Sequence, residues 1–471
     1  MKNTPAMADY ELRHIEALRK NLAGCTVLLK KDGSFPLEKP CTLAAYGSGV
    51  RRTIRGGTGS GEVNSRYSVT IEEGLQQAGF TLTGMEWHTG YEQARKKAHK
   101  AFLKQLKKDA KAVKQNFILY GMGKAMPEPE YNLPLNAEGD AAIYVVSRIS
   151  GEGNDRTPLK GDIRLTDSEV RDILALDKKF TRFMLVLNVG GVVDLSPVMD
   201  VRNILLLSQL GVETGGALAD ILLGKANPSG KLTTTWAAFE EYPEMPDFED
   251  MNETRYREGI YVGYRYFDTF RKPALFPFGH GLSYTEFRLG AVAVEANGAQ
   301  ITVRTFVENI GALAGRQVVQ VYLSKPSGKF DAPWQELCAF AKTHELAPGE
   351  TESVTCSFTL PEMAAYDTET ASYILEAGDY LVRVGVSSVE TAPAAVLHLD
   401  KTVTTLQANN VLGSTDFTDL TAPASTMERP AGVPVIEIDP VAIACETVAY
   451  DRTEEVLPEV DALTKEDAAC F

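Results

Sequence analysis

The chain has 471 residues, which is long enough for two or three domains that each bury a core. Its 48 lysines and arginines are outnumbered by 63 aspartates and glutamates, so the net charge is −15. A charge of this sign disfavours nucleic acid and anionic membranes as partners, and neutral ligands such as sugars are easier to reconcile with it. The six cysteines lack C-x-x-C spacing, which argues against common zinc and redox motifs and indicates reduced, mostly buried thiols.

The chain also lacks the usual membrane and secretion signals. Its first twenty residues have no uninterrupted apolar core, and no segment reaches the roughly 18 apolar residues of a membrane span. We therefore expect a cytoplasmic protein that does not bind membranes.

Residues 1–235 alternate short apolar runs with helical patterns, which predicts an α/β layered domain with a largely parallel sheet. The clearest helix is LTDSEVRDILALDKKF, where Thr166 and Glu169 can form a capping box. Its expected apolar face is Val170, Ile173, Leu174 and Leu176. Runs that are apolar throughout are typical of strands covered on both faces. The runs are TVLLK (26–30), TLAAYG (42–47), AAIYVVS (141–147), RFMLVLNVGG (182–191) and NILLLSQ (203–209).

A lysine-rich helix is predicted over 91–115. Its lysines could suggest nucleic-acid binding. However, the apolar residues share one side at helical spacing, so we expect the lysines to form a solvated face. The residues on the apolar side are Ala94, Ala98, Phe102, Leu106 and Val113.

The remaining chain changes character three times. Residues 236–285 are rich in aromatics and proline, which indicates a connecting segment in loop conformation. Residues 286–400 alternate apolar and polar positions between turn signals, which predicts an antiparallel β-sandwich. Residues 401–471 are irregular and acidic and are expected to form a linker.

Glu152 is the leading candidate for a chemical role. It follows the apolar run 141–147 and is flanked by Gly151 and Gly153, so it belongs at the carboxyl end of a buried strand. Partial desolvation there would raise its pKa and allow it to donate a proton. Asp155 and Arg156 can pair with each other or with nearby backbone to fix the loop. An ordinary surface turn explains the same residues.

A second glycine-rich loop, GGTGSGEVNSR, spans 56–66. It lacks the Gly-Lys-Ser/Thr ending of a phosphate-binding loop, so a flexible loop that lines a neutral-ligand site and a structural turn both remain open. No serine lies in a G-x-S-x-G elbow and no H-x-x-x-H pair is present, which argues against serine or zinc hydrolysis. His280, in FPFGHGLSY, is interpreted as a loop-packing residue.

Several segments, taken together and in order, resemble glycoside hydrolase family 3, the family of β-glucosidases, over nearly residues 10–400. The segments are NLAGCTVLLKKDGSFPL, RGGTGSGEVNSRYSVTIEEGL, VVSRISGEGNDR, VLNVGGVVDL, GGALADILLGKANPSGKLTTTW, YREGIYVGYRYFDT, FPFGHGLSYTEF and AGRQVVQVYLSKPSGKFDAPWQELCAFAKT with LAPGE.

The resemblance implies an α/β sandwich domain followed by a fibronectin type III-like domain. In such enzymes a (β/α)8 barrel supplies an aspartate nucleophile, and the sandwich supplies the acid/base glutamate, which here matches Glu152. The GTGSG segment matches a loop near the same site, so Gly59, Ser60 and Gly61 are candidate lining residues. The implied reaction is retaining hydrolysis of terminal β-glucosyl or related residues, without metal or organic cofactor.

No barrel is recognisable in the 471 residues, and VDALTKEDAACF at their end resembles the approach to one. We therefore expect the front part of a member with swapped domain order, inactive alone, with the barrel supplied in cis or in trans. Two alternatives are a non-catalytic carbohydrate-binding or scaffold protein and a subunit completed by a separate barrel chain. The sugar stays open among glucose, xylose, arabinose and N-acetylglucosamine, as do linkage and oligomeric state.

Overall fold

The computed structural model describes residues 7–153, 155–244, 252–410, 413, 415–423 and 429–447. The first part of the chain folds around a six-stranded sheet in the order β1-β6-β5-β4-β2-β3. Neighbouring strands are parallel except β1, which runs antiparallel to β6. The predicted largely parallel sheet is therefore confirmed. Its strands are β1 (Val27–Lys30), β2 (Thr42–Tyr46), β3 (Thr81–Thr83), β4 (Ala141–Arg148), β5 (Phe183–Val189) and β6 (Ile204–Leu206).

Helices cover both faces of this sheet, which explains why its central strands are apolar throughout. All residues of β4 and β5 are buried, and successive side chains of β4 enter opposite cores. Helices α3 and α5 pack on one face, and α2 and α6 pack on the other. The helices of this part are α1 (Asp9–Leu22), α2 (Ile71–Gln77), α3 (Met85–Ala112), α4 (Phe117–Gly121), α5 (Asp167–Lys179) and α6 (Thr214–Leu222).

Helix α5 confirms the predicted capping box, because Thr166 Oγ1 accepts from the Glu169 amide at 3.0 Å and Glu169 Oε2 accepts from the Thr166 amide at 2.8 Å. Its apolar face is narrower than predicted. Ile173 and Leu176 are fully buried, whereas Leu174 is 37% exposed, because the sheet covers only one stripe of the helix.

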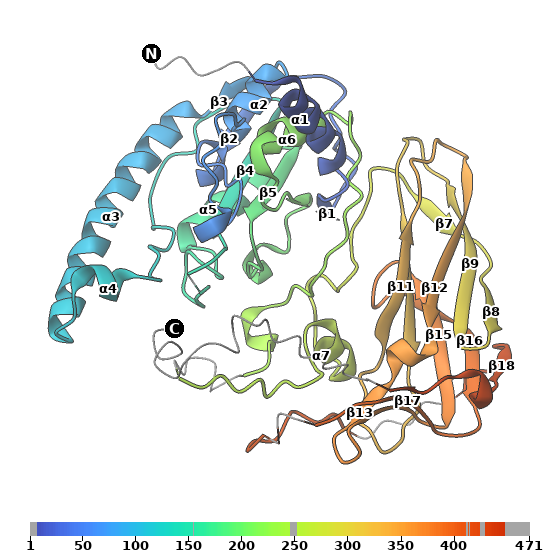
Figure 1. The fold of residues 1–471 in the computed structure, drawn as a ribbon. Helices are drawn as coiled ribbons and strands as arrows, with labels where there is room; N and C mark the ends of the chain where they lie inside the picture. The colour runs from blue at the N-terminus through green and yellow to red at the C-terminus, as the bar shows by residue number, and fades with distance from the viewer. Residues whose placement is uncertain are drawn as a thin grey trace.

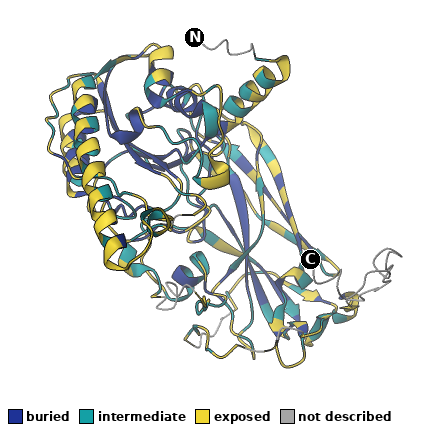
Figure 2. Cartoon of the chain, turned by 60° about the vertical axis from the view of Figure 1, so that its left-hand side comes forward, coloured by how far each residue is buried: buried dark blue, intermediate teal, exposed yellow. Residues whose placement is uncertain are grey.

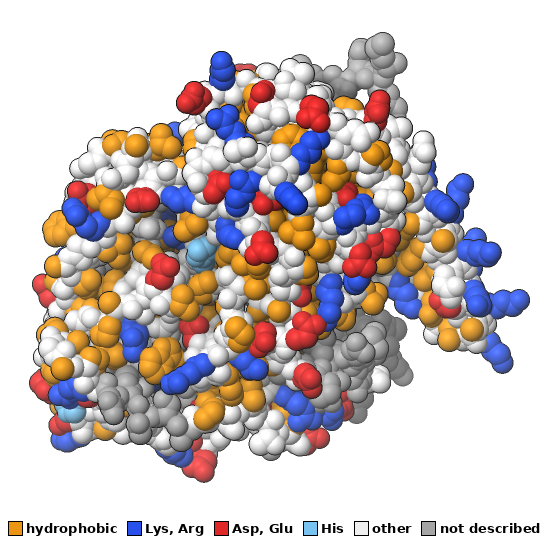
Figure 3. All heavy atoms as spheres, turned by 180° about the vertical axis from the view of Figure 1, so that it is seen from behind, with side chains coloured by type: hydrophobic (Ala, Val, Ile, Leu, Met, Phe, Trp, Pro, Cys, Tyr) orange, Lys and Arg blue, Asp and Glu red, His pale blue; other side chains and the backbone are white. Residues whose placement is uncertain are grey.

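Helix α3 begins at Met85, earlier than predicted, and projects from the sheet with α4 at its tip (Figure 1). Figure 2 shows its long exposed face, and Figure 3 shows the lysines gathered on this arm. Its lysines are exposed as predicted, while Leu106 is buried and Ala94, Ala98 and Phe102 are partly buried. Val113 is 54% exposed, so its predicted place on the buried side is wrong, because the helix has ended at Ala112 and left the core.

The second part of the chain is a β-sandwich beside the α/β part (Figure 1). One sheet has the order β11-β10-β15-β16-β18, and the other has β12-β9-β7 with β8 also paired to β9. Apolar residues of both sheets form one core. The predicted alternating strands are therefore confirmed. The strands are β7 (Phe287–Leu289), β8 (Ala293–Asn297), β9 (Gln300–Asn309), β10 (Val318–Ser324), β11 (Glu336–Lys342), β12 (Thr351–Thr359), β15 (Gly378–Gly385), β16 (Thr391–Leu399) and β18 (Val435–Ile438).

The stretch expected to be a linker contributes strands instead. β18 extends one sandwich sheet, and a small third sheet has the order β13-β14-β17-β19. Pairing with the sandwich orders these residues although their own pattern is weak. The barrel-like segment proposed near residue 471 lies outside the described residues. The strands of the third sheet are β13 (Ala365–Asp367), β14 (Ser372–Leu375), β17 (Val403–Gln407) and β19 (Glu446–Thr447).

The aromatic connecting segment packs between the two parts and includes a short α-helix, α7 (Tyr264–Thr269), where the sequence predicts a loop. Tyr264 stacks on Phe278 with ring centroids 4.5 Å apart. Gln320 of β10 donates to the carbonyl of Gly279 at 3.1 Å. His280 contacts the Leu29 carbonyl at 3.0 Å, which confirms its interpretation as a packing residue.

The cysteines differ from expectation in their exposure. Cys356 is buried, Cys41 and Cys338 are half-buried, and Cys25 and Cys445 are exposed, so the prediction of mostly buried thiols is wrong. These five described cysteines are all free thiols. Among the described residues, no helix is long and apolar enough to cross a membrane.

Candidate functional site

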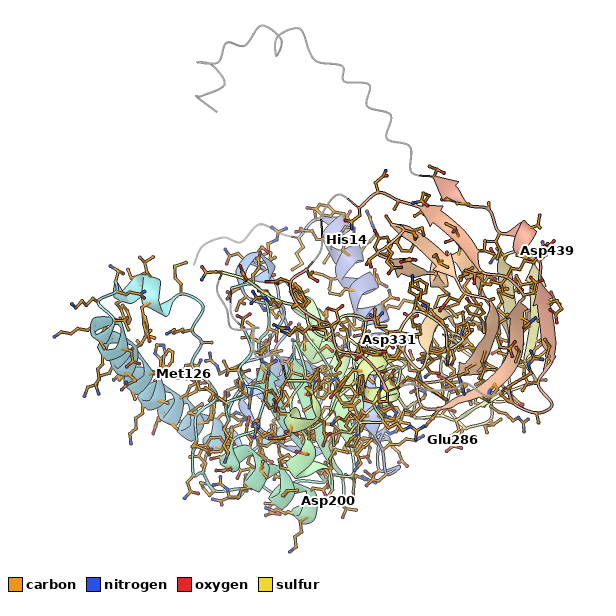
Figure 4. All side chains as sticks on the ribbon, turned by 90° about the horizontal axis from the view of Figure 1, so that it is seen from below. His14, Met126, Asp200, Glu286, Asp331 and Asp439 are labelled. Atoms are coloured by element: carbon orange, nitrogen blue, oxygen red, sulfur yellow. The ribbon has the colours of Figure 1, made fainter. Side chains whose placement is uncertain are left out.

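The carboxyl ends of the parallel strands β2, β4, β5 and β6 meet at one edge of the sheet, where ligand sites of such sheets are usually found. A cavity of about 1050 Å³ opens at this edge. It is lined by the loops that follow β2, β4 and β6, by α3 and by the segment after α4. Phe102 of α3 and Met126, labelled in Figure 4 on the segment after α4, both line it.

The two predicted glycine loops lie against each other at the rim of this cavity. A Cβ atom on Gly57 would lie 2.4 Å from the carbonyl oxygen of Ser150, and one on Gly151 would lie 2.2 Å from the Thr58 amide nitrogen. Both distances are far below van der Waals contact. The close approach of the backbones therefore requires glycine at both positions.

This packing holds Glu152 at its backbone and at its side chain. The Glu152 amide donates to the Thr58 carbonyl at 3.3 Å, and the Thr58 hydroxyl donates to the Glu152 carbonyl at 2.9 Å. The Glu152 carboxylate accepts from the Ser60 amide at 2.8 Å. Glu152 is exposed and is not among the lining residues, although Gly151 and Asp155 are.

The electrostatics of Glu152 differ from the sequence-based expectation. Hydrogen bonding from Ser60 holds the pKa of Glu152 below its usual value, because it stabilises the carboxylate. We expected desolvation to raise this pKa. That expectation is wrong for this chain, because the side chain is open to solvent and the described residues do not cover it.

The residues proposed to structure the loop divide into two groups. Gly151 packs on the other glycine loop, and Gly153 has a φ of +80°, which favours glycine. Arg156 forms its ion pair with Asp162 and not with the exposed Asp155, and it takes the other alternative, a bond to nearby backbone, by donating to the Val192 carbonyl at 3.3 Å. Arg156 also donates to the Ser150 hydroxyl at 3.1 Å.

Two of the three candidate lining residues, Gly59 and Ser60, lie beside Glu152. Gly59 has a φ of +75°, and a Cβ there would be 2.5 Å from the Glu152 Cβ. Ser60 supplies the amide that binds the carboxylate, and Gly61 lines the cavity. Their proposed contacts with a substrate stay predictions.

The sequence analysis missed a second carboxyl group in the cavity, that of Glu128. The Tyr91 hydroxyl donates to its carboxylate, and its amide donates to the Gly161 carbonyl at 2.8 Å. Burial raises the pKa of Glu128. Glu128 lies in the proline-flanked run MPEPEYNLP, which has no strand or helix period, so no local pattern placed it at the site. Within the described part of the chain, no group of three or more His, Cys, Asp or Glu could hold a metal ion.

Comparison with known proteins gives the class of this arrangement. Residues 26–284 match the glycosyl hydrolase family 3 C-terminal domain, and residues 317–388 match a fibronectin type III-like domain. The chain thus consists of an α/β domain of the kind found in glycosyl hydrolases, followed by a fibronectin type III-like domain. It belongs to glycosyl hydrolase family 3.

Relatives and solved structures agree with this assignment. The chain is 34% identical to β-glucosidase A of Butyrivibrio fibrisolvens over 460 residues, covering 86% of this chain and 53% of that protein. It is 30% identical over 413 residues to thermostable β-glucosidase B of Acetivibrio thermocellus, covering 86% and 51%. The structure of β-glucosidase 3B from Thermotoga neapolitana in complex with α-D-glucose matches with a TM-score of 0.71 at 34% identity, covering 84% and 55%. The chain therefore spans about half the length of these relatives.

Proposed function

We propose that this chain is the acid/base-bearing part of a retaining β-glucosidase, with Glu152 as the acid/base residue. The observation that carries the proposal is the position of Glu152. Two interlocked glycine loops present it at the rim of the cavity, at the carboxyl edge of the sheet. Family membership and relatives named β-glucosidase support the reaction class.

The proposed reaction needs a second carboxylate, which we assign to a (β/α)8 barrel supplied in cis or in trans. The barrel carboxylate attacks the anomeric carbon while the Glu152 carboxyl gives its proton to the departing oxygen. Glu152 then takes a proton from water as the water attacks the glycosyl–enzyme bond. Retention requires the two carboxyls about 5–5.5 Å apart, so the barrel has to dock against the rim of the cavity.

Docking also offers a physical reason for the pKa of Glu152 to change. In this chain the exposed carboxylate is stabilised by Ser60, which suits a base and not an acid. A second carboxylate within about 5 Å, together with exclusion of water, would raise this pKa. This chain alone is therefore expected to be inactive on aryl β-glucosides.

The test is Glu152→Gln in the polypeptide that includes the barrel. Loss of the acid should reduce kcat/KM for phenyl β-glucoside by about 10²–10⁴-fold. Hydrolysis of 2,4-dinitrophenyl β-glucoside should be reduced much less in its bond-breaking step, because that leaving group needs little protonation. The control is Glu138→Gln, an exposed glutamate before β4 that is paired with Lys179. Equal kinetics of Glu152→Gln and wild type would refute the assignment.

A non-catalytic carbohydrate-binding role is the second candidate, because the cavity is formed within this chain alone. Isothermal titration of the isolated chain with a β-glucoside measures it. Saturable binding here, together with no hydrolysis by the barrel-containing polypeptide, would favour this second candidate.

A further inference from the structure

The chain segment that carries Glu152 is anchored on both sides by one arginine. Before Glu152, the Arg156 guanidinium donates to the Ser150 hydroxyl at 3.1 Å, and after Glu152 it pairs with Asp162. It also donates to the Val192 carbonyl at 3.3 Å, in the loop that follows β5. Arg156 therefore connects the entry and the exit of the Glu152 loop to the sheet.

Asp162 fixes the position of this arginine. Its second carboxylate oxygen accepts from the Thr157 amide at 2.6 Å and from the Thr157 hydroxyl at 2.9 Å. Asp162 is thus bound to both residues that directly continue the chain after Asp155. The side chains of Arg156 and Asp162 are 18% and 19% exposed, so their interaction is less screened than that of an ordinary surface pair.

The backbone of Asp162 is bound in turn by a buried side chain of the sheet. Nε of Arg148, the last residue of β4, donates to the Asp162 carbonyl at 3.0 Å. The same guanidinium forms a buried pair with Glu169 of α5 at 2.6 Å. A continuous series of charge-assisted hydrogen bonds therefore runs from α5 through β4 to Asp162, Arg156 and Ser150.

We propose that Asp162 is a positioning residue for Glu152, acting through Arg156. This inference rests on the proposed function for its catalytic consequence, although the geometry stands without it. An ordinary structural role would stabilise the fold without affecting where the Glu152 carboxylate lies. A positioning role makes the Ser60–Glu152 contact depend on the carboxylate of Asp162.

The first test compares this chain with its Asp162→Asn variant. The titration of the Glu152 carboxylate is followed by ¹³C NMR of labelled glutamate. The Glu152 signal is assigned as the one that is missing in Glu152→Gln. In the wild type, Ser60 keeps the pKa of Glu152 below the ordinary value of about 4.3. Asp162→Asn should move it up toward that value, because the loop no longer holds the carboxylate against the Ser60 amide. An unchanged titration would overturn the proposal. The control is Asp167→Asn, which removes an exposed carboxylate paired with Lys160.

The second test measures kcat/KM of the barrel-containing polypeptide for phenyl and 2,4-dinitrophenyl β-glucosides. Asp162→Asn should lower the phenyl-to-dinitrophenyl ratio by up to the order of 10²-fold, the effect of a displaced catalytic group. An equal loss for both substrates, or no loss, would overturn positioning. If the wild type hydrolyses neither substrate, the proposed function fails, while the titration still decides whether Asp162 positions Glu152.

Discussion

The position of Glu152 is set by glycines and by a backbone amide, not by large side chains. Gly57, Gly59 and Gly151 allow two backbones to approach, and the Ser60 amide binds the carboxylate. The geometry of the site therefore depends on the absence of a Cβ atom at these glycines as well as on the hydrogen bond to the carboxylate. Substituting a glycine tests this dependence directly.

We expect Gly59→Ala to displace Glu152. The added Cβ would lie 2.5 Å from the Glu152 Cβ and 2.7 Å from its Oε2, and the φ of +75° adds about 1–2 kcal/mol of strain. Activity toward phenyl β-glucoside should fall, while thermal unfolding shows only a modest loss of stability. Gly349→Ala is the matched control, because it has a φ of +80° but no neighbour within 4 Å. Similar activity of both variants would contradict the proposed contact.

Sequence reasoning placed the glycine loops and Glu152 at one site and left Arg156 to pair with Asp155 or with nearby backbone. Arg156 does bind the Val192 carbonyl, but its ion pair is with Asp162. The pairing with Asp162 depends on a turn over 157–164 that no short pattern specifies. The pKa direction of Glu152 was wrong for a related reason. Exposure is a property of the folded surface, and a carboxylate after a buried strand can still lie in solvent.

At the scale of elements, α5 and β4 are joined by a buried ion pair. The side chains of Arg148 and Glu169 are 5% and 2% exposed, and Glu169 also caps its own helix. A buried ion pair contributes little net stability. Removing one partner is nevertheless strongly destabilising, because the other charge stays buried without compensation.

Glu169→Gln is expected to destabilise the α/β domain by about 3–5 kcal/mol, because Arg148 would remain buried without the carboxylate to which it is hydrogen-bonded. Urea unfolding followed by circular dichroism measures this loss. Asp167→Asn removes the exposed partner of Lys160 and should cost at most about 1 kcal/mol. Equal effects of the two substitutions would contradict the structural distinction between them.

Strongly patterned elements were predictable, and short strands without an apolar run of their own were not. The fully apolar β4 and β5 and the capping box of α5 were recognisable because their own residues specify them. The three-residue β3 and the strands β17 to β19 are defined by their neighbours, and their sequences carry no clear period. For this reason the prediction of a linker over 401–471 is wrong at residues 403–407 and 435–438, which form β17 and β18.

At the scale of the whole molecule, the two parts meet across α7 and the aromatic segment. Asp268 of α7 lies at this junction, where burial raises its pKa to about 6. It accepts from the Gln335 side-chain amide at 3.2 Å and from the Ser388 hydroxyl at 3.4 Å. At neutral pH the junction therefore contains a carboxylate whose ionised form is less stable in the folded protein than in the unfolded chain.

Asp268→Asn should stabilise the protein at pH 7 by up to roughly 3 kcal/mol, from about two pKa units at 1.36 kcal/mol each. Because the folded pKa exceeds the unfolded value, the wild type should lose stability as the pH rises from about 4 to 6, and the variant should not. The asparagine amide could also donate to the Gln335 Oε1, which has no hydrogen-bond partner in the described part of the chain. Thermal unfolding from pH 4 to 8 provides the measurement, and parallel curves for both proteins would contradict the account.

The central claim, that Glu152 is the acid/base residue, is tested most directly by chemical rescue. In Glu152→Ala of the barrel-containing polypeptide, azide can attack the glycosyl–enzyme without the base that water requires. With 2,4-dinitrophenyl β-glucoside, azide should therefore raise the rate and yield β-glucosyl azide, while wild type and Glu138→Ala should not respond. Absence of both rescue and the β-azide product in an otherwise folded Glu152→Ala protein would contradict the claim.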